Sequence, residues 1–121
     1  MSMTVLTVDD SRTMREMLRL ALADAGVRVV QAEDGIHGLE VLQAESPQVI
    51  VTDINMPRMD GFGFIEEVRG DQRYRGIPIL VLTTESDAEK KNRARMAGAT
   101  GWIVKPFNPV KLVDAIRRVA A

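Results

Sequence analysis

Five residues with chemically active side chains each follow a short apolar run of this 121-residue chain: Asp9, Asp10, Asp53, Thr83 and Lys105. Three carboxylates gathered in one place repel one another, and a bound Mg²⁺, which prefers oxygen ligands, removes that repulsion. A lysine ammonium and a threonine hydroxyl suit the oxygens of a phosphoryl group. Brought into one crevice, these side chains predict a Mg²⁺-dependent phosphoryl site.

The run that ends on Asp53 indicates how this carboxylate is positioned. Residues 49–52 are β-branched, and Pro47 and Pro57 flank them, which is typical of a strand buried on both faces of a parallel sheet. Ligands collect beyond the carboxyl ends of such strands, so Asp53 is placed for chemistry. The alternative is that Asp53 only caps a turn. Other carboxylates and a lysine follow other predicted strands in the same way, which counts against this alternative.

Strand and helix patterns alternate five times along the chain. The expected strands cover residues 4–8, 27–30, 49–52, 77–82 and 101–104. The expected helices run over 11–25, from 34 to before Pro47, from 60 to before Gly70, from 86 to about 97, and from 108 onward. This alternation predicts an α/β fold in which helices cover both faces of a parallel sheet.

The expected fourth helix differs from the others. Ser86 and Glu89 match a capping box, and Gly98 is placed to end the helix. Between them, the sequence offers little to bury beyond Ala88, Ala94 and Met96. We therefore expect this helix to be the least firmly held of the five.

Length and composition narrow the class of protein. The length predicts one domain over residues 1–121. The absence of cysteine excludes a disulfide scaffold, a thiolate metal site and a cysteine nucleophile. The first residues carry neither a basic leader nor a long apolar run, so we expect a cytoplasmic protein without a signal peptide or membrane span.

Charge is unevenly distributed along the chain. Residues 1–84 contain 8 Lys/Arg against 13 Asp/Glu, whereas residues 85–121 contain 8 against 4. The last third therefore predicts a basic face on a mildly acidic body. Such a face suits nucleic acid or an acidic protein surface, although no aromatic-rich platform or recognition motif for nucleic acid accompanies the basic residues.

Four motifs together resemble the receiver domains of two-component response regulators, and the stand-alone CheY-like chemotaxis regulators in particular. They are Val8-Asp9-Asp10, the segment 52–61, Thr83 and the segment 101–107. The resemblance covers nearly the whole chain. It implies a flavodoxin-like (βα)5 three-layer sandwich with a five-stranded parallel sheet in the order 2-1-3-4-5.

The resemblance also implies a role for each residue of the acidic site. Asp53 would accept a phosphoryl group from a phosphohistidine of a sensor histidine kinase. Asp10 and Asp53 would bind Mg²⁺ directly, Asp9 would act through water, and Asn55 would contribute its backbone carbonyl. Lys105 would pair with the phosphoryl oxygens. Such a protein catalyses only its own phosphorylation and dephosphorylation, and is not an enzyme with a separate substrate.

Further positions match the parts of a receiver that report its state. Thr83 would bond the phosphoryl group and move with it, and Trp102 would be the switch aromatic. Receivers usually have tyrosine or phenylalanine there, so the larger indole is expected to turn inward less completely. A purely structural tryptophan is the alternative. The bond from Lys105 to Pro106 would be cis.

Asn55 and Glu85 occupy positions that tune the phosphoryl lifetime in this family. The alternative is that both are solvated loop residues. His37, the only histidine, is expected on the surface of the second helix.

We expect the output surface to lie on the basic last third, where another protein binds. This chain is expected to be a monomer. A flagellar motor switch component is the leading expected partner, and neither nucleic acid nor a membrane is expected. A phosphate sink or a phosphorelay shuttle would look much the same. The expected output residues are Lys90, Lys91, Arg95 and Lys111, together with Thr83 and Trp102.

A different class of function is a hydrolase of the haloacid-dehalogenase type, which also carries a nucleophilic aspartate at the end of a parallel strand. Such enzymes need a second aspartate two residues further on as general acid. This chain has Asn55 at that position, which counts against the hydrolase.

Overall fold

The computed structural model describes residues 3–121. The strands are β1 (Thr4–Val8), β2 (Arg28–Ala32), β3 (Val49–Thr52), β4 (Ile79–Thr83) and β5 (Gly101–Val104). The helices are α1 (Arg12–Asp24), α2 (Gly35–Glu45), α3 (Gly61–Gly70), the 3₁₀ turn η1 (Gln72–Tyr74), α4 (Ala88–Ala97) and α5 (Pro109–Ala120). All strands are parallel and form one sheet in the order β2-β1-β3-β4-β5. This architecture confirms the predicted flavodoxin-like sandwich.

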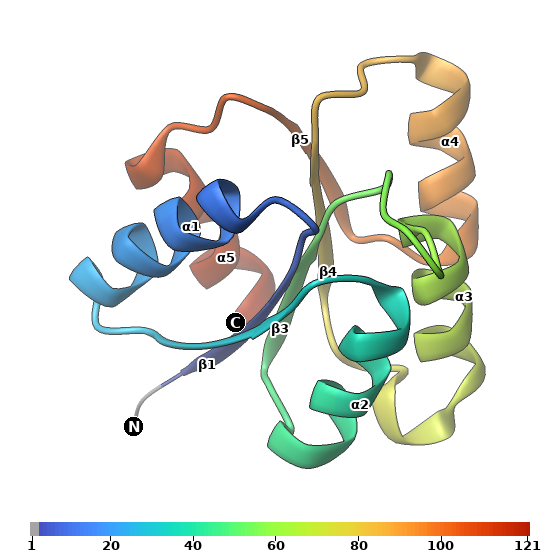
Figure 1. The fold of residues 1–121 in the computed structure, drawn as a ribbon, viewed down its shortest axis with the longest axis horizontal. Coiled ribbons are helices and arrows are strands. Elements are labelled where there is room, and N and C mark those ends of the chain that lie inside the picture. The colour runs from blue at the N-terminus through green and yellow to red at the C-terminus, as the bar shows by residue number, and fades with distance from the viewer. Residues whose placement is uncertain (1–2) are drawn as a thin grey trace.

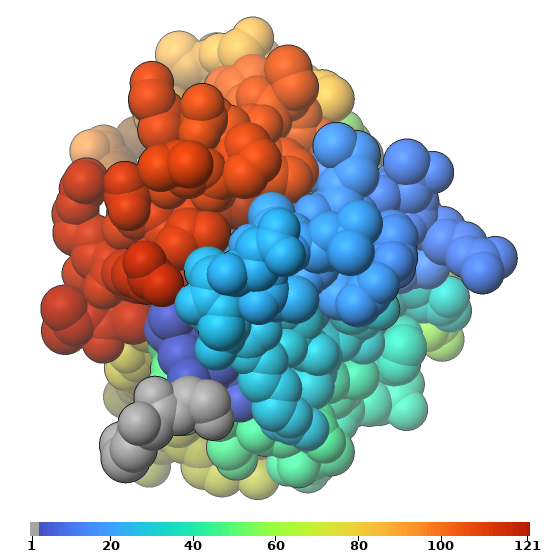
Figure 2. All heavy atoms as spheres, turned by 90° about the vertical axis from the view of Figure 1, so that its left-hand side faces the viewer, coloured from blue at the N-terminus to red at the C-terminus, as the bar shows by residue number. Residues whose placement is uncertain are grey.

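Helices cover both faces of the sheet and make two separate cores. α1 and α5 lie on one face, and α2, α3 and α4 lie on the other (Figure 1). Figure 2 looks onto the first of these faces, where α1 and α5 are neighbours. Alternate strand residues supply the two cores: Val5 and Val49 pack under α1 and α5, whereas Leu6 and Ile50 pack under α2 to α4. This is the two-residue period of a strand buried on both sides.

The central strands deliver the predicted acidic residues to one edge of the sheet. β1 and β3 pair so that Val8 faces Thr52, and the backbone N–H of Asp53 donates to the carbonyl of Val8 at 2.9 Å. Asp9 and Asp53 therefore leave adjacent strands at the same level.

Short polar side chains begin the helices largely where the sequence predicts. Ser11, Asp34, Asp60 and Asn108 each accept a hydrogen bond from the backbone N–H three residues later. The predicted capping box at the fourth helix was wrong in its first residue. α4 starts after Asp87. The Asp87 carboxylate accepts the Glu89 N–H at 2.8 Å and so takes the capping position expected for Ser86.

Two strands and one connection differ from the sequence-based bounds. β2 runs over Arg28–Ala32, displaced toward the C-terminus, because parallel pairing with β1 sets its extent. β4 starts at Ile79 instead of 77, since Pro78 supplies only its carbonyl, which accepts from Ile50 N at 2.9 Å. The connection 70–76 contains η1, which begins where the Asp71 side chain accepts from Arg73 N.

α4 buries fewer residues than any other α-helix, in line with the expectation that it is the least firmly held. Ala94 is its only buried residue, whereas α3 buries five residues. None of the helices in the described part of the chain has the length and apolarity that a membrane crossing requires.

Candidate metal and phosphoryl site

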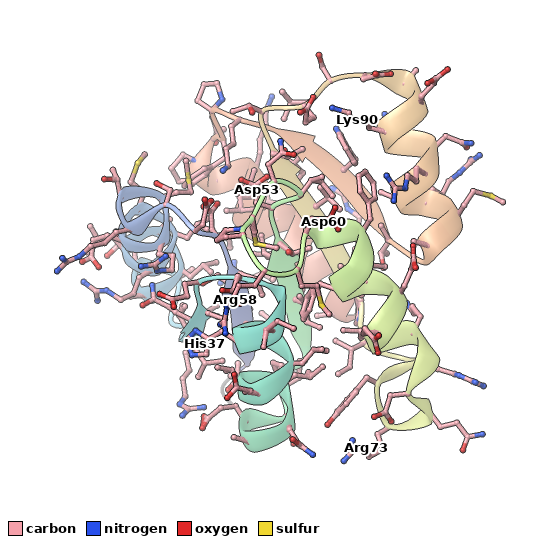
Figure 3. All side chains as sticks on the ribbon, turned by 45° about the vertical axis from the view of Figure 1, so that its right-hand side comes forward. His37, Asp53, Arg58, Asp60, Arg73 and Lys90 are labelled. Atoms are coloured by element: carbon pink, nitrogen blue, oxygen red, sulfur yellow. The ribbon has the colours of Figure 1, made fainter. Side chains whose placement is uncertain are left out.

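Three carboxylates meet at the carboxyl edge of the sheet. Asp9, Asp10 and Asp53 each offer a ligand oxygen, and these oxygens lie within 4.8 Å of one another. Asp9 is buried and Asp10 is exposed, while the side chain of Asp53 is 12% exposed. Asp53 stands at the end of the central strands, where the loop that leads to Asp60 and α3 begins (Figure 3).

Lys105 reaches this cluster from the end of β5. Its Nζ donates to Asp53 Oδ2 at 2.8 Å and to Asp9 Oδ2 at 2.9 Å. Burial alone would lower the pKa of Lys105, but the hydrogen bonds to Asp53 and Asp9 outweigh it and leave the pKa raised. The lysine is therefore charged at neutral pH. The bond from Lys105 to Pro106 is cis, as the resemblance implied.

Asp9 is the most deeply buried of the three carboxylates. Its Oδ1 accepts the Ser11 N–H at 2.8 Å, and its carbonyl accepts from Arg15 Nη1 at 2.7 Å. Burial raises the pKa of Asp9, and the bond to Lys105 offsets only part of this effect. The site thus contains a buried carboxylate that one ammonium does not fully compensate.

The donor set fits Mg²⁺. Three carboxylates against one lysine leave an excess of negative charge, and oxygen donors are those that this cation selects. Asp9 and Asp53 each spend one oxygen on a backbone N–H, of Ser11 and Ile54 respectively. Asp9, Asp10 and Asp53 would hold the ion, which would supply positive charge against the carboxylates and an incoming phosphoryl group.

A close approach between the backbone of Gly61 and that of residues 53–54 fixes the position of Asp53. The first residue of α3 is Gly61, and its N–H donates to the Ile54 carbonyl at 2.7 Å. A Cβ added to Gly61 would collide with the Asp53 carbonyl and lie 2.8 Å from the Ile54 Cα. Only glycine allows this contact, so the turn after β3 and the position of Asp53 depend on each other.

Asn55 and Glu85 form a bridge across the mouth of the site. Asn55 Nδ2 donates to Glu85 Oε1 at 3.0 Å, and Lys90 Nζ lies 3.0 Å from the same oxygen. The hydrogen bonds from Asn55 and then Lys90 lower the pKa of Glu85. The two residues are therefore bonded to each other at a position that solvent reaches. Their influence on phosphoryl lifetime stays a prediction.

Thr83 and Trp102 both contact the loop between β4 and α4. The buried Thr83 hydroxyl accepts the Glu85 N–H at 3.3 Å. The half-buried Trp102 packs on the core under α2 to α4, and its Nε1 donates to the Glu85 carbonyl at 3.1 Å. The indole is thus only partly inside, and it is joined to the same loop as Thr83.

The predicted output residues do not all lie together. Lys91, Arg95 and Trp102 line a groove of about 350 Å³ between α4 and β5. Lys90 instead pairs with Glu85, and Lys111 lies on α5, outside the lining of this groove.

His37 is half-buried rather than fully on the surface. Its Nδ1 accepts the Glu33 N–H at 3.1 Å, because α2 turns back over the end of β2. The sequence-based reasoning also missed a pair that lies close by, Arg58 and Asp34, whose contacts are described below. Asp34 was recognisable as a helix cap, but nothing local marks its partner 24 residues away.

Comparison with known proteins assigns the chain to a family. A family model described as the response regulator receiver domain matches residues 5–117. The chemotaxis protein CheY1 of Helicobacter pylori is 40% identical over 119 residues, covering 97% of this chain and 96% of its own length. The chemotaxis protein CheY-3 of Vibrio cholerae is 35% identical over 119 residues, covering 98% and 92%. The chain belongs to the response regulator receiver family.

Solved structures agree with this assignment. The chemotaxis response regulator CheY4 of Vibrio cholerae superposes with a TM-score of 0.92 at 46% identity, covering 98% of this chain and 99% of its own. A putative response regulator of Chloroflexus aurantiacus gives 0.94 at 33% identity, covering 99% and 98%. Within the family, this chain is therefore a CheY-like receiver domain of a two-component system.

Proposed function

We propose that this protein is a response regulator whose Asp53 takes a phosphoryl group from a sensor histidine kinase in a Mg²⁺-dependent reaction. One observation carries the proposal: Asp53 shares its carboxylate cluster with a lysine ammonium 2.8 Å away. The ammonium offsets the repulsion among the carboxylates and places a positive charge where the incoming phosphoryl group carries negative charge.

The transfer is a displacement at phosphorus. An Asp53 carboxylate oxygen attacks the phosphorus of a phosphohistidine, an acyl phosphate forms, the P–N bond breaks, and the imidazole nitrogen keeps the electron pair and then takes a proton. Such reactions need positioning and charge neutralisation more than covalent help. The protein modifies itself and turns over no separate substrate.

Each neighbour of Asp53 has a part in this step. Lys105 is already held by Asp9 at 2.9 Å, so it stays in place when Asp53 gains the phosphoryl group and can pair with its oxygens. The Thr83 hydroxyl can exchange its bond from Glu85 N for one to the phosphoryl group. This exchange would move the loop that Trp102 also contacts, and so pass the state of Asp53 to the groove beside α4.

A chemotaxis role is the output that the relatives favour. The matched Helicobacter and Vibrio proteins are chemotaxis proteins. We propose a flagellar motor switch component as the corresponding partner of this protein. The groove lined by Lys91, Arg95 and Trp102 suits an acidic segment of such a partner.

The phosphoacceptor assignment can be tested with a small acyl-phosphate donor and intact-mass measurement. Wild-type protein should gain one phosphoryl group with Mg²⁺ and none after EDTA. Asp53→Asn should gain none. Asp60→Asn is the matched control, because Asp60 is exposed and asparagine caps a helix as well as aspartate does. A mass shift that persists in Asp53→Asn would contradict the proposal.

The output surface needs a separate experiment. Beryllofluoride-loaded protein, a mimic of the phosphorylated state, should retain its partner better than unloaded protein does. Reversal of charge at Lys91 and Arg95 should reduce that retention while phosphorylation of Asp53 continues. Loss of both properties together would show misfolding. Lys111→Glu, which lies outside the groove lining, shows how far the surface extends onto α5.

A further inference from the structure

An arginine and an aspartate form an ion pair beside the metal site without entering it. Arg58 Nε donates to Asp34 Oδ2 at 2.7 Å, and Arg58 Nη2 donates to Asp34 Oδ1 at 3.0 Å. Both bonds run in the planar, two-point geometry that guanidinium and carboxylate favour. Asp34 is 2% exposed, whereas the Arg58 side chain is 54% exposed. Figure 3 shows Arg58 between Asp53 and the start of α2.

The pair joins two segments whose backbones already touch. We call residues 53–60 the phosphoacceptor loop. The Gly35 N–H, at the start of α2, donates to the Met59 carbonyl at 3.1 Å. A Cβ at Gly35 would lie 2.7 Å from that carbonyl oxygen, so the contact is as close as glycine permits. Asp34 also caps α2 through the His37 N–H at 2.9 Å, which fixes the carboxylate that receives Arg58.

The backbone of Arg58 shows that its position is imposed. Its φ of 64° lies in the left-handed region, which a residue with a Cβ adopts at a cost and glycine or asparagine adopts more readily. Within the described residues, Ser46 at the end of α2 is the only other non-glycine residue there. The two-point bond to Asp34 offsets this cost and holds the loop in the left-handed turn.

Asn55 lies between two fixed points of the phosphoacceptor loop. The base of the loop is closed by the Gly61 N–H on the Ile54 carbonyl at 2.7 Å, and the far side is held at Arg58 and Met59. The three residues that remain include Pro57, whose φ is restricted. The direction of the Asn55 carbonyl therefore depends on both anchors.

We propose that the Arg58–Asp34 pair is a positioning clamp for the metal site, which keeps the Asn55 carbonyl directed to Mg²⁺ before the ion binds. This inference rests on the proposed function, where that carbonyl is a metal ligand. A loop that is ordered in advance loses less conformational freedom on binding, so the clamp raises Mg²⁺ affinity. Neither side chain belongs to the carboxylate cluster that would hold the ion.

The clamp and simple electrostatics predict different outcomes, which gives a sharp test by isothermal titration with MgCl₂. Removing the positive charge in Arg58→Gln should tighten Mg²⁺ binding slightly if charge alone matters, and Asp34→Asn should weaken it. A clamp requires both variants to bind Mg²⁺ more weakly, by about tenfold, as outer-shell partners of metal sites do. The double variant should be no weaker than either single variant, because both remove the same contact.

Further variants separate positioning from folding. Arg58→Gly removes the ion pair and should weaken Mg²⁺ binding. It should cost less thermal stability than Arg58→Gln, because glycine adopts the left-handed backbone without strain. Arg58→Lys should recover only part of the affinity: the ammonium keeps the charge but cannot make the two-point bond. Arg73→Gln breaks another arginine–aspartate pair, with Asp71, at the opposite end of the molecule from Asp53 (Figure 3) and should leave Mg²⁺ affinity unchanged.

Each outcome decides the matter. Tenfold weaker binding in both single variants without further loss in the double variant supports the clamp. Mg²⁺ affinities within twofold of wild type, or shifts of opposite sign, overturn the clamp and leave the phosphorylation of Asp53 standing. A wild-type protein that neither binds Mg²⁺ nor accepts phosphate overturns both proposals. If Asp34→Asn does not fold, the variants of the exposed Arg58 still decide the question.

Discussion

The two sides of the acidic crevice are held in different ways. On one side, the phosphoacceptor loop is fixed by a buried carboxylate, by backbone bonds and by glycines whose backbones touch it. On the other side, α4 buries only Ala94. The proposed function explains this difference: a side that binds the phosphoryl group needs donors at fixed positions, whereas a side that reports its state needs an arrangement that changes at low cost.

The contacts of α4 show where its freedom lies. Arg93 stacks on the Phe62 ring with its guanidinium 4.0 Å from the ring centroid, and Lys90 pairs with Glu85. At the C-terminal end, Arg69 of α3 donates to the Gly98 carbonyl at 3.0 Å. Each of these contacts uses at least one side chain that solvent reaches. They are contacts that a small change in the neighbouring loop can replace.

The largest expected effect comes from breaking the rigid side. Gly61→Ala places a methyl group against the Asp53 carbonyl and the Ile54 Cα, where neither backbone can yield. We expect the free energy of unfolding to fall by about 3 kcal/mol, the upper part of the range for overpacking. Urea denaturation followed by circular dichroism measures it.

Gly70→Ala is the control for this substitution. Gly70 is the last residue of α3, and a Cβ there meets no atom within 4 Å. Alanine should stabilise the protein slightly by reducing the freedom of the unfolded chain. Equal destabilisation by both substitutions would mean that the close approach at Gly61 does not hold the site.

A smaller effect is expected on the α4 side. Arg93→Ala removes the stacking on Phe62 and should cost about 1 kcal/mol or less, as for exposed cation–π pairs. Amide hydrogen exchange should become faster in α4 and remain unchanged in α2. Arg95→Ala, which loses only an exposed bond to Asn92, serves as control. Faster exchange in both helices would contradict the view that separate contacts hold the two sides.

The smallest expected effect is a pH dependence of the Arg58–Asp34 pair. The bond from Arg58 holds the pKa of Asp34 below its usual value, so the folded protein binds that proton less readily than the unfolded chain does. The stabilisation is therefore complete above a pH of about 4, and is lost as the pH falls through the lower folded pKa.

Asp34→Asn isolates this contribution, because asparagine keeps the helix cap. The difference in the free energy of unfolding between wild type and Asp34→Asn should shrink as the pH is lowered from 5 to 2. It should be modest throughout, since Arg58 is exposed and water screens the pair. A difference that grows on acidification would reverse the assigned sign.

Some of the site follows from local sequence rules. Apolar runs that end on Asp9 and Asp53 identify parallel strands, and parallel strands bring their carboxyl ends to one edge, so the carboxylate cluster and its lysine could be predicted. Helix caps such as Asp60 and Asn108 are equally local, because the side chain reaches a backbone N–H three residues away. The predicted cap at Ser86 was wrong because the neighbouring Asp87 caps the helix instead.

Other parts of the site depend on how the layers pack, which no local pattern records. Arg58 meets Asp34 across 24 residues, and Asn55 meets Glu85 across 30, through loops that leave different strands. Trp102 reaches the Glu85 carbonyl only because β5 lies beside β4. The sequence by itself determined which side chains reach the edge of the sheet. The tertiary structure alone decided which of them meet, because the strand register and helix packing set the distances between loops.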